Sequence, residues 1–365
     1  AGDWGQIVFY DSSVDASYGG NGDYASGSIL EYCTVEYGGG LLLSKGNPFI
    51  NQSTIRYHSS SGIKMDSWDS SNSGSTLKIT NNTISNNTSS GDGGGIYLYG
   101  YGTAYVSGNT ISNNIGSSGG GIKIAAPGTI VISGNTIENN KTGRYEDTPS
   151  GTEFRVDGQG GGIGAGGSSV LNNVIKGNQS GKGGGIEGGS GTITGNIIIN
   201  NTADERGGGF YYDGSSSSSS PFSNNFILSN TASTGGGIYV QGGKDMTGNV
   251  IAGNTGGALY YQHEGYDGTV RFSSNTVFNN TGSPVVYLKA GGRESNSPLE
   301  VKNNTIVGNS GSPTVSWGKS TSDPSIYTFS YNNIYGNSGT YELATTIALG
   351  TDLTVENNYW GTSDA

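Results

Sequence analysis

Two short motifs recur along almost the whole chain, and their recurrence constrains the fold more than any other feature. The clearest copy is NNTISNNTSSGDGGGIYL at residues 81–98, where Asn82, Ile84 and Asn87 are followed by a glycine triplet that leads into Ile96. The first Asn of the motif stands, at spacings of 23 to 38 residues, at Asn82, Asn109, Asn135, Asn173, Asn196, Asn225, Asn249, Asn275, Asn304 and Asn332. With the degenerate copies at both ends, about 12 to 13 copies occupy residues 1–365, which predicts a single repeat domain.

Each repeat contains three short segments in which apolar and polar residues alternate with a period of two, as in Leu77-Lys78-Ile79. No segment sustains the 3.6-residue period of a helix, and the many glycines and β-branched residues also disfavour helix. Three strands and three turns per repeat predict a coil that stacks on the next coil. The stacked strands would form three parallel sheets around an apolar core, so the expected fold class is an all-β solenoid of about 12 to 13 coils.

The recurring Asn and Gly have structural roles in such a coil. A short amide side chain tolerates the left-handed conformation of a tight turn, and stacked Asn amides bond one another along the axis. We therefore expect Asn82 and its nine equivalents to form an asparagine ladder. Glycines such as those at 93–95 permit a sharp bend or the close approach of a neighbouring coil.

The combination of GGGI with I-x-x-N, from Trp4-Gly5-Gln6-Ile7 to Asn358-Tyr359-Trp360-Gly361, resembles the right-handed parallel β-helix family. Pectate lyases share this architecture, and the repeats are similar to the GGAI and FxxN repeats of chlamydial polymorphic outer-membrane proteins. The resemblance implies a right-handed solenoid. It is specific for fold and not for function, because one β-helix scaffold hosts enzymes, adhesins and structural rods.

The charge balance narrows the choice of partners. The chain has 17 Lys and Arg against 28 Asp and Glu, which gives a net charge of −11 and a pI near 4.6. Nucleic acids and anionic membranes gain no counterion-release or charge-pairing energy from such a surface, so neither is an expected partner.

Cys33 is the sole cysteine, which excludes an intrachain disulfide and thiolate metal clusters, and we expect it to be a small buried side chain. No metal site and no cofactor are expected. No apolar run approaches the ~18 residues that span a bilayer. Few lysines with abundant Asn, Ser, Thr and Gly suit a secreted or cell-surface bacterial protein.

A column of tyrosines is a candidate ligand or partner face. In each coil the residue after the apolar anchor of the glycine-led strand should point outward, and several of these residues and their next outward neighbours are aromatic. The column contains Tyr97, Tyr99, Tyr211, Tyr239, Tyr260 and Tyr287. Stacked rings could serve as platforms for sugars, and the alternative is that they only stabilise the exposed strands.

The catalytic candidates lie where the tyrosines of this column give way to Lys123 and Glu187. A charged insertion at 141–158, which includes Arg144 and Arg155, stretches one repeat nearby. A polysaccharide lyase needs a Lys or Arg base and cations that neutralise the uronate carboxylate, and the resemblance to pectate lyases places such groups on this sheet and its loops. The alternative for the insertion is a solvated protrusion or protein contact. A second insertion, the Ser-rich stretch 214–221, is interpreted as a loop.

His58 and His263 are the only histidines, and neither has a nucleophile at a defined spacing, so both are expected to be ordinary surface residues. The preferred functional hypothesis is an extracellular structural β-solenoid without catalysis, such as a rod, a filament subunit or an adhesin stalk. Its expected partner is a further copy of itself, bound end to end. The alternative is a β-helix that binds or degrades a polysaccharide or cell-surface glycan through the Lys123 and Glu187 face and the 141–158 insertion.

Overall fold

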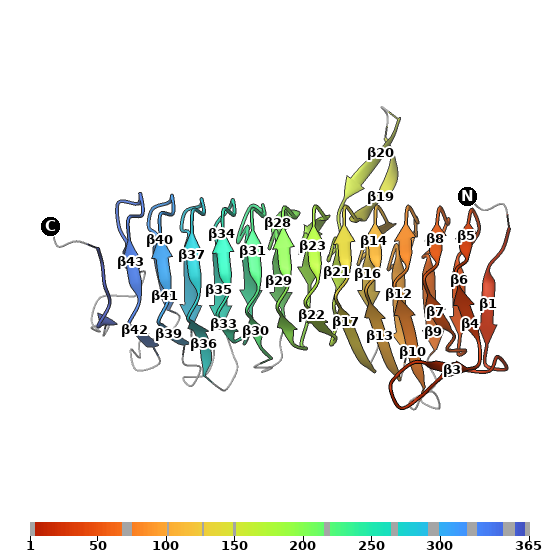
Figure 1. Cartoon of the computed structure of the whole chain (residues 1–365). Helices are drawn as coiled ribbons and strands as arrows, with labels where there is room; N and C mark the ends of the chain where they lie inside the picture. The colour runs from red at the N-terminus through yellow and green to blue at the C-terminus, as the bar shows by residue number, and fades with distance from the viewer. Residues whose placement is uncertain are drawn as a thin grey trace. The chain divides into compact units, whose positions relative to one another are not determined.

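The computed structural model describes residues 4–67, 75–100, 102–125, 128–148, 151–214, 220–263, 269–290, 299–319, 327–345 and 355–361. These residues form strands, turns and irregular segments without an α-helix, so within them no helix is long and apolar enough to cross a membrane. The chain divides into two compact units, Ala1–Gly191 and Thr192–Ala365. Each unit is a stack of parallel β coils (Figure 1).

The first unit has three parallel sheets. Its first sheet is formed, in spatial order, by β1 (Ile7–Tyr10), β6 (Leu41–Ser44), β9 (Ile63–Ser67), β12 (Ile96–Gly100), β16 (Ile122–Ile124), β21 (Ile163–Gly164) and β25 (Ile186–Glu187). The second is formed by β4 (Ile29–Glu31), β7 (Phe49–Asn51), β10 (Thr76–Thr80), β13 (Thr103–Ser107), β17 (Thr129–Ser133) and β22 (Ser169–Leu171). The third is formed by β5 (Thr34–Glu36), β8 (Thr54–Arg56), β11 (Thr83–Ser85), β14 (Thr110–Ser112), β18 (Thr136–Glu138) and β23 (Val174–Lys176).

The second unit repeats this arrangement. Its first sheet contains β29 (Phe210–Asp213), β32 (Ile238–Gln241), β35 (Leu259–His263), β38 (Val286–Ala290), β41 (Val315–Lys319) and β44 (Leu343–Thr345). The second contains β26 (Ile193–Thr194), β30 (Phe222–Ser223), β33 (Met246–Thr247), β36 (Val270–Ser273), β39 (Leu299–Lys302), β42 (Tyr327–Ser330) and β45 (Val355–Glu356). The third contains β27 (Ile197–Ile199), β31 (Phe226–Leu228), β34 (Val250–Ala252), β37 (Thr276–Phe278), β40 (Thr305–Val307) and β43 (Asn333–Tyr335).

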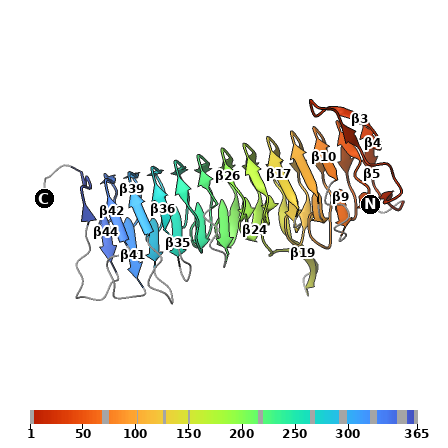
Figure 2. The same cartoon turned by 90° about the horizontal axis from the view of Figure 1, so that it is seen from below.

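Shorter strands lie beside these sheets. In the first unit, β15 (Ile115–Gly116), β19 (Lys141–Thr148) and β24 (Gln179–Lys182) pair in parallel, and β20 (Gly151–Val156) pairs antiparallel with β19. The second unit carries β28 (Thr202–Arg206). An antiparallel pair, β2 (Ser17–Tyr18) and β3 (Tyr24–Ser26), lies against the second sheet of the first unit (Figure 2). There the Tyr24 ring stacks on Phe49, with centroids 5.7 Å apart.

The core consists of apolar columns that the parallel register stacks along each unit. Ile84 pairs in register with Ile55 on one side and Ile111 on the other, and all three side chains are fully buried. Each such side chain contributes about 1.5–3 kcal/mol of burial free energy. The prediction of an all-β parallel solenoid with three parallel sheets is therefore confirmed, while the prediction that residues 1–365 form one continuous domain stays a prediction.

The predicted asparagine ladder is confirmed at all ten positions, each at most 2% exposed. Asn82 is representative: its backbone N–H and its side-chain Nδ2 both donate to Oδ1 of Asn109, at 2.9 and 3.0 Å, and Nδ2 also donates to the Ile50 carbonyl. In the first unit the degenerate copy Ser53 continues the series, because its N–H donates to Oδ1 of Asn82 at 2.9 Å. The amides thus satisfy turn backbone groups that the core removes from water.

A second ladder runs beside the first and uses the other Asn of the motif. In the first unit its members are Asn87, Asn114, Asn140 and Asn178, and in the second unit they are Asn201, Asn230, Asn254, Asn280, Asn309 and Asn337. The Nδ2 of Asn87, for example, donates to Oδ1 of Asn114 at 2.9 Å. Within each unit, side-chain hydrogen bonds of the two ladders therefore join each coil to the next at both ends of its third-sheet strand.

One detail of the sequence interpretation is wrong. We expected the ladder Asn to adopt the left-handed turn conformation, whereas the residue before it does so: Asn81 and Asn86 have φ of 56°. The ladder residue must aim its amide along the axis, so the left-handed bend falls on its neighbour. Cys33 also differs from expectation, because it lies in a turn and is exposed.

The glycine triplet combines the two roles that the sequence left open. Gly93 has a φ of 66°, which provides the bend. A Cβ on Gly94 would lie 2.5 Å from the Ile115 carbonyl oxygen, so this residue lets the next coil approach closely.

We predict that Asn249→Ala lowers the free energy of unfolding by about 2–4 kcal/mol, because it removes the side-chain acceptor of the buried Asn225 N–H and one donor to the Phe222 carbonyl. Urea titration followed by circular dichroism measures the change. The matched control is Asn279→Gly in the same unit, an exposed residue with a φ of 53°, which glycine adopts readily. Equal losses in the two variants would contradict a stabilising role for the ladder.

Candidate functional site

The left-handed turn position after each third-sheet strand differs between coils of the first unit. Three successive coils carry Asn there, at 86, 113 and 139, each with a φ near 55°. The two preceding coils carry Tyr37 and Tyr57 instead, with φ of 64° and 57°. A bulky aromatic residue in this conformation is an outlier, because its Cβ crowds the following carbonyl at a cost of roughly 1–2 kcal/mol.

The two tyrosines stack on each other at the surface. Their ring centroids are 5.3 Å apart with an interplanar angle of 12°, and the residues are 43% and 37% exposed. The Arg56 guanidinium lies 5.2 Å from the Tyr57 ring centroid and forms an ion pair with Glu36 at 2.7 Å. The result is an exposed aromatic shelf, made of Tyr37 and Tyr57, that the sequence interpretation missed. The signal that would have found it is a tyrosine where most other coils have Asn or Gly.

The charged insertion at 141–158, interpreted from the sequence as a loop, forms a β-hairpin of β19 and β20. Tyr145 and Phe154 face each other across it with centroids 5.1 Å apart, which favours strand pairing. Figure 1 shows the hairpin projecting from the coils of its unit. Residues 149–150 lie outside the described residues.

The hairpin arginines engage carboxylates of the same insertion. Arg144 Nε lies 2.7 Å from Glu146 and its Nη1 lies 3.4 Å from Asp157, while Arg155 lies 3.6 Å from Glu146. The hydrogen bond from Arg144 lowers the pKa of Glu146 below its ordinary value. The cations that we considered for neutralising a substrate carboxylate are thus already paired with acidic side chains.

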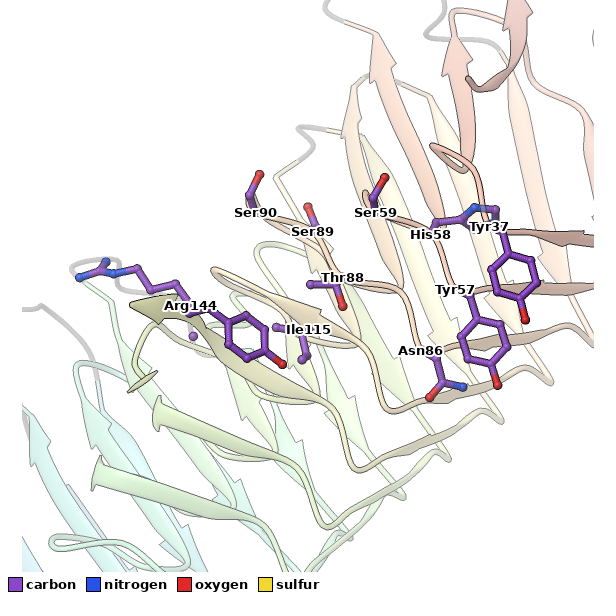
Figure 3. A pocket seen from close by; sticks show the side chains of 12 residues that line it. Tyr37, Tyr57, His58, Ser59, Asn86, Thr88, Ser89, Ser90, Ile115 and Arg144 are labelled. Carbon is purple, nitrogen blue, oxygen red and sulfur yellow. The ribbon is translucent and has the colours of Figure 1, made fainter. Parts of the chain in front are cut away.

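A pocket of about 730 Å³ lies between the aromatic shelf and the hairpin. Figure 3 shows Tyr37 and Tyr57 at one end and Arg144 at the other, with Thr88 and Ile115 between them. Its lining is completed by Asn86, His58, Gly143, Tyr145 and the serines at 59, 89 and 90. The volume is within the range of small-ligand sites, about 300–1,000 Å³.

His58 lies beneath the shelf and occupies a ladder position rather than the surface position that we expected. Its backbone N–H donates to Oδ1 of Asn87, its Nδ1 accepts from the Gly38 N–H, and its Nε2 therefore donates to the Val35 carbonyl. The residue is 1% exposed, and burial lowers its pKa below the ordinary value. His58 thus continues the second ladder as a neutral imidazole. His263, also expected at the surface, is likewise 1% exposed.

Lys123 and Glu187, the catalytic candidates of the first sheet, bind each other. The column register is as predicted, with Lys123 beside Gly164 and Gly164 beside Glu187. Lys123 Nζ reaches across Gly164 to Glu187 Oε2 at 3.3 Å, and a Cβ on Gly164 would lie 2.6 Å from the Lys123 side chain. Neither residue lines the 730 Å³ pocket, whereas Arg144 does. The structure does not bring these candidates together with the hairpin in that pocket.

The tyrosine column of the second unit is a continuous stack. Tyr211, Tyr239, Tyr260 and Tyr287 pair in register, with successive centroids 5.4, 4.7 and 4.5 Å apart. Their hydroxyls are held too: Tyr211 donates to Asp213 and Tyr260 to Gln262. Burial raises the pKa of Tyr211.

This stack corrects part of the predicted contact face. Tyr211 and Tyr239 are only 4% exposed because their neighbours and Arg206 cover them, so neither offers ring surface to a ligand. Tyr260 and Tyr287 are half-buried and border a smaller pocket of about 390 Å³ beside Pro284. In the first unit Tyr97 and Tyr99 are also half-buried, with centroids 6.2 Å apart.

A buried lysine was not anticipated from the sequence. Lys244 in the second unit is fully buried, with its Nζ 5.3 Å from the Tyr212 ring centroid. The Tyr261 hydroxyl accepts from the Lys244 N–H and donates to the Lys244 carbonyl. Burial lowers the pKa of Lys244 to about 8.

Among the described residues no cluster of His, Cys, Asp or Glu has the arrangement of a metal site. Residues 215–219 of the predicted Ser-rich loop lie outside the described part of the chain.

The chain matches the model of a known protein family. The family model for a right handed beta helix region matches residues 5–111 and 68–245, which together span more than half of the chain. Among curated proteins no match was found. Among solved structures no match was found either.

We predict that the free energy of unfolding falls as pH drops below about 6.5, and that His58→Asn reduces this fall. The unfolded histidine binds a proton near that pH, whereas the buried His58 has a lowered pKa and stays neutral, so protons favour the unfolded state. One proton contributes a slope of at most about 1.4 kcal/mol per pH unit. Urea titrations between pH 5 and 8 measure the slope, and identical slopes in both proteins would refute this origin.

We predict a coupling energy of about 1 kcal/mol between Lys123 and Glu187, because their side chains are only 19% and 18% exposed. A double-mutant cycle with Lys123→Met and Glu187→Gln measures it from urea unfolding. The control cycle is Lys176 with Glu138, a more exposed ion pair of the same unit, which should couple more weakly. Zero coupling for Lys123 and Glu187 would contradict their role as a stabilising bridge.

Proposed function

The chain belongs to the right-handed β-helix family, and we propose that it works as a non-catalytic structural scaffold outside the cell, as a rod, a filament subunit or an adhesin stalk. The observation that carries this proposal is the pair of asparagine ladders. Within each unit they join successive coils through buried side chains at both ends of the third-sheet strand. A scaffold needs such regular coupling between neighbouring coils.

The chemistry of the charged residues supports the same proposal. Lys123 and Glu187 neutralise each other across Gly164, and Arg144 and Arg155 bind carboxylates of their own hairpin. A lyase base must accept a proton from the substrate, and an ammonium that donates to a carboxylate lacks a lone pair for that step. We therefore assign Lys123, Glu187 and the two hairpin arginines a role in stabilising the surface through ion pairs.

Secretion and self-association complete the proposal. A surface rich in Asn, Ser, Thr and Gly with a net charge of −11 suits an extracellular protein, and parallel coils can propagate by end-to-end contact between copies of the chain. The alternative function is a β-helix that binds or degrades a polysaccharide through the face around Lys123 and Glu187 and the 141–158 insertion.

We predict that the purified chain forms no unsaturated uronate and no new reducing ends from polygalacturonate or alginate, because the ammonium of Lys123 is held in an ion pair with Glu187. Absorbance and reducing-end assays measure product, with the heat-denatured chain as control. In sedimentation velocity the chain should associate as concentration rises, and electron microscopy should show end-to-end assemblies.

Two outcomes would contradict the proposal. Product that appears with the wild-type chain and disappears in Lys123→Ala would establish the enzymatic alternative. A chain that sediments as a monomer at every concentration would exclude the filament subunit and leave the stalk.

A further inference from the structure

We propose that the pocket between the aromatic shelf and the β19–β20 hairpin binds a neutral polysaccharide, with a sugar ring stacked on Tyr57. This goes beyond the scaffold function and does not depend on self-association. The proposal starts from the backbone: Tyr37 and Tyr57 occupy left-handed positions where Asn or Gly would be less strained. They also expose aromatic surface to water. Both features oppose folding stability, and these two rings also stack on each other and line the pocket, which points to a role in binding.

The orientation of the shelf leaves one ring face available. Tyr37 stacks on the face of Tyr57 that is directed toward β5, the strand that precedes Tyr37 in the neighbouring coil. The next coil in the other direction carries Asn86, whose side chain is shorter than a tyrosine ring. The other face of the Tyr57 ring therefore borders the pocket, which both Tyr57 and Asn86 line.

The pocket is a consequence of the order of coils. Between the coil of Tyr57 and the coil that carries the hairpin lie two coils with Asn86 and Asn113 at the turn position. Three coil spacings of about 4.8 Å make a hollow about 14 Å wide. Tyr145 of the hairpin, 59% exposed, stands at the far wall, and the half-buried Ile115 lies between the walls. Two aromatic walls over a partly apolar floor fit a short run of sugar rings.

The polar lining matches hydroxyl groups. Ser59, Thr88 and Ser90 are exposed around the pocket, and Asn86 adds an amide that both donates and accepts hydrogen bonds. A pyranose ring has an apolar face for stacking and hydroxyls at its rim, so this mixture of aromatic and hydroxyl side chains suits it.

The charges favour a neutral rather than an acidic ligand. Arg144 is the sole Lys or Arg among the lining residues that the structure describes, and it already binds Glu146 and Asp157. The net charge of −11 further opposes a polyanion.

Affinity electrophoresis of the full chain tests the proposal, with gels that contain xylan, mixed-linkage β-glucan, galactomannan or dextran, and parallel gels with polygalacturonate or alginate. We expect retardation in at least one neutral polymer, little changed by salt. Tyr57→Asn and Tyr145→Ser should weaken binding about ten-fold or more, because each removes an aromatic wall. The matched control is Tyr105→Ser on β13, a tyrosine 40% exposed that does not line the pocket, which should bind like the wild type.

Stability separates loss of binding from loss of folding. Asn is the residue of the next three coils at this turn position, so Tyr57→Asn should leave the urea midpoint unchanged or raise it. Retardation in no neutral polymer, retardation only by the acidic polymers, or binding that survives in Tyr57→Asn would each overturn the proposal. None of these results bears on end-to-end association, which sedimentation measures separately.

Discussion

The structure depends on hydrogen bonds that run from each coil to the next. A turn that closes a coil brings backbone N–H and C=O groups to the edge of an apolar core, where water does not reach them. The ladder amides solve this problem, since a single Asn accepts two hydrogen bonds through Oδ1 and donates from Nδ2 to a neighbouring amide and to a carbonyl. Because each coil satisfies its neighbours, stability is shared between adjacent coils and does not require a compact globular core.

This constraint decides where the chain can vary. The ladder residue and the core isoleucine are fixed by their contacts, whereas the left-handed residue beside the ladder points away from the core. Tyr37 and Tyr57 occupy that position, and the hairpin begins on the other side of the ladder, directly after the ladder residue Asn140. The aromatic shelf and the hairpin therefore lie outside an undisturbed scaffold, which is where a binding site can arise without a loss of ladder bonds.

The outward residues of the first sheet show how the same register can serve stability. In the second unit, the tyrosines at 211, 239, 260 and 287 stack because the coils stack. In the first unit, Lys123 and Glu187 form an ion pair for the same reason. The sequence pattern suggests an aromatic or charged face, but most of these side chains are engaged in contacts with neighbouring coils. The exposed rings of the aromatic shelf, Tyr37 and Tyr57, lie elsewhere, at a turn.

The amino-acid sequence by itself determined the β-helix, its three parallel sheets and the ladder Asn, because each of these depends on a local pattern repeated in every coil. The sequence also predicted which outward residues of the first sheet lie beside one another, because the glycine triplet before each strand fixes where that strand begins. Only the tertiary structure showed which outward residues are covered: Tyr211 is buried by its stacked neighbours, and His58 is buried in a ladder position. It alone brought Tyr57 and Tyr145 to the same pocket, because their proximity depends on the spacing of coils and on the path of one inserted hairpin.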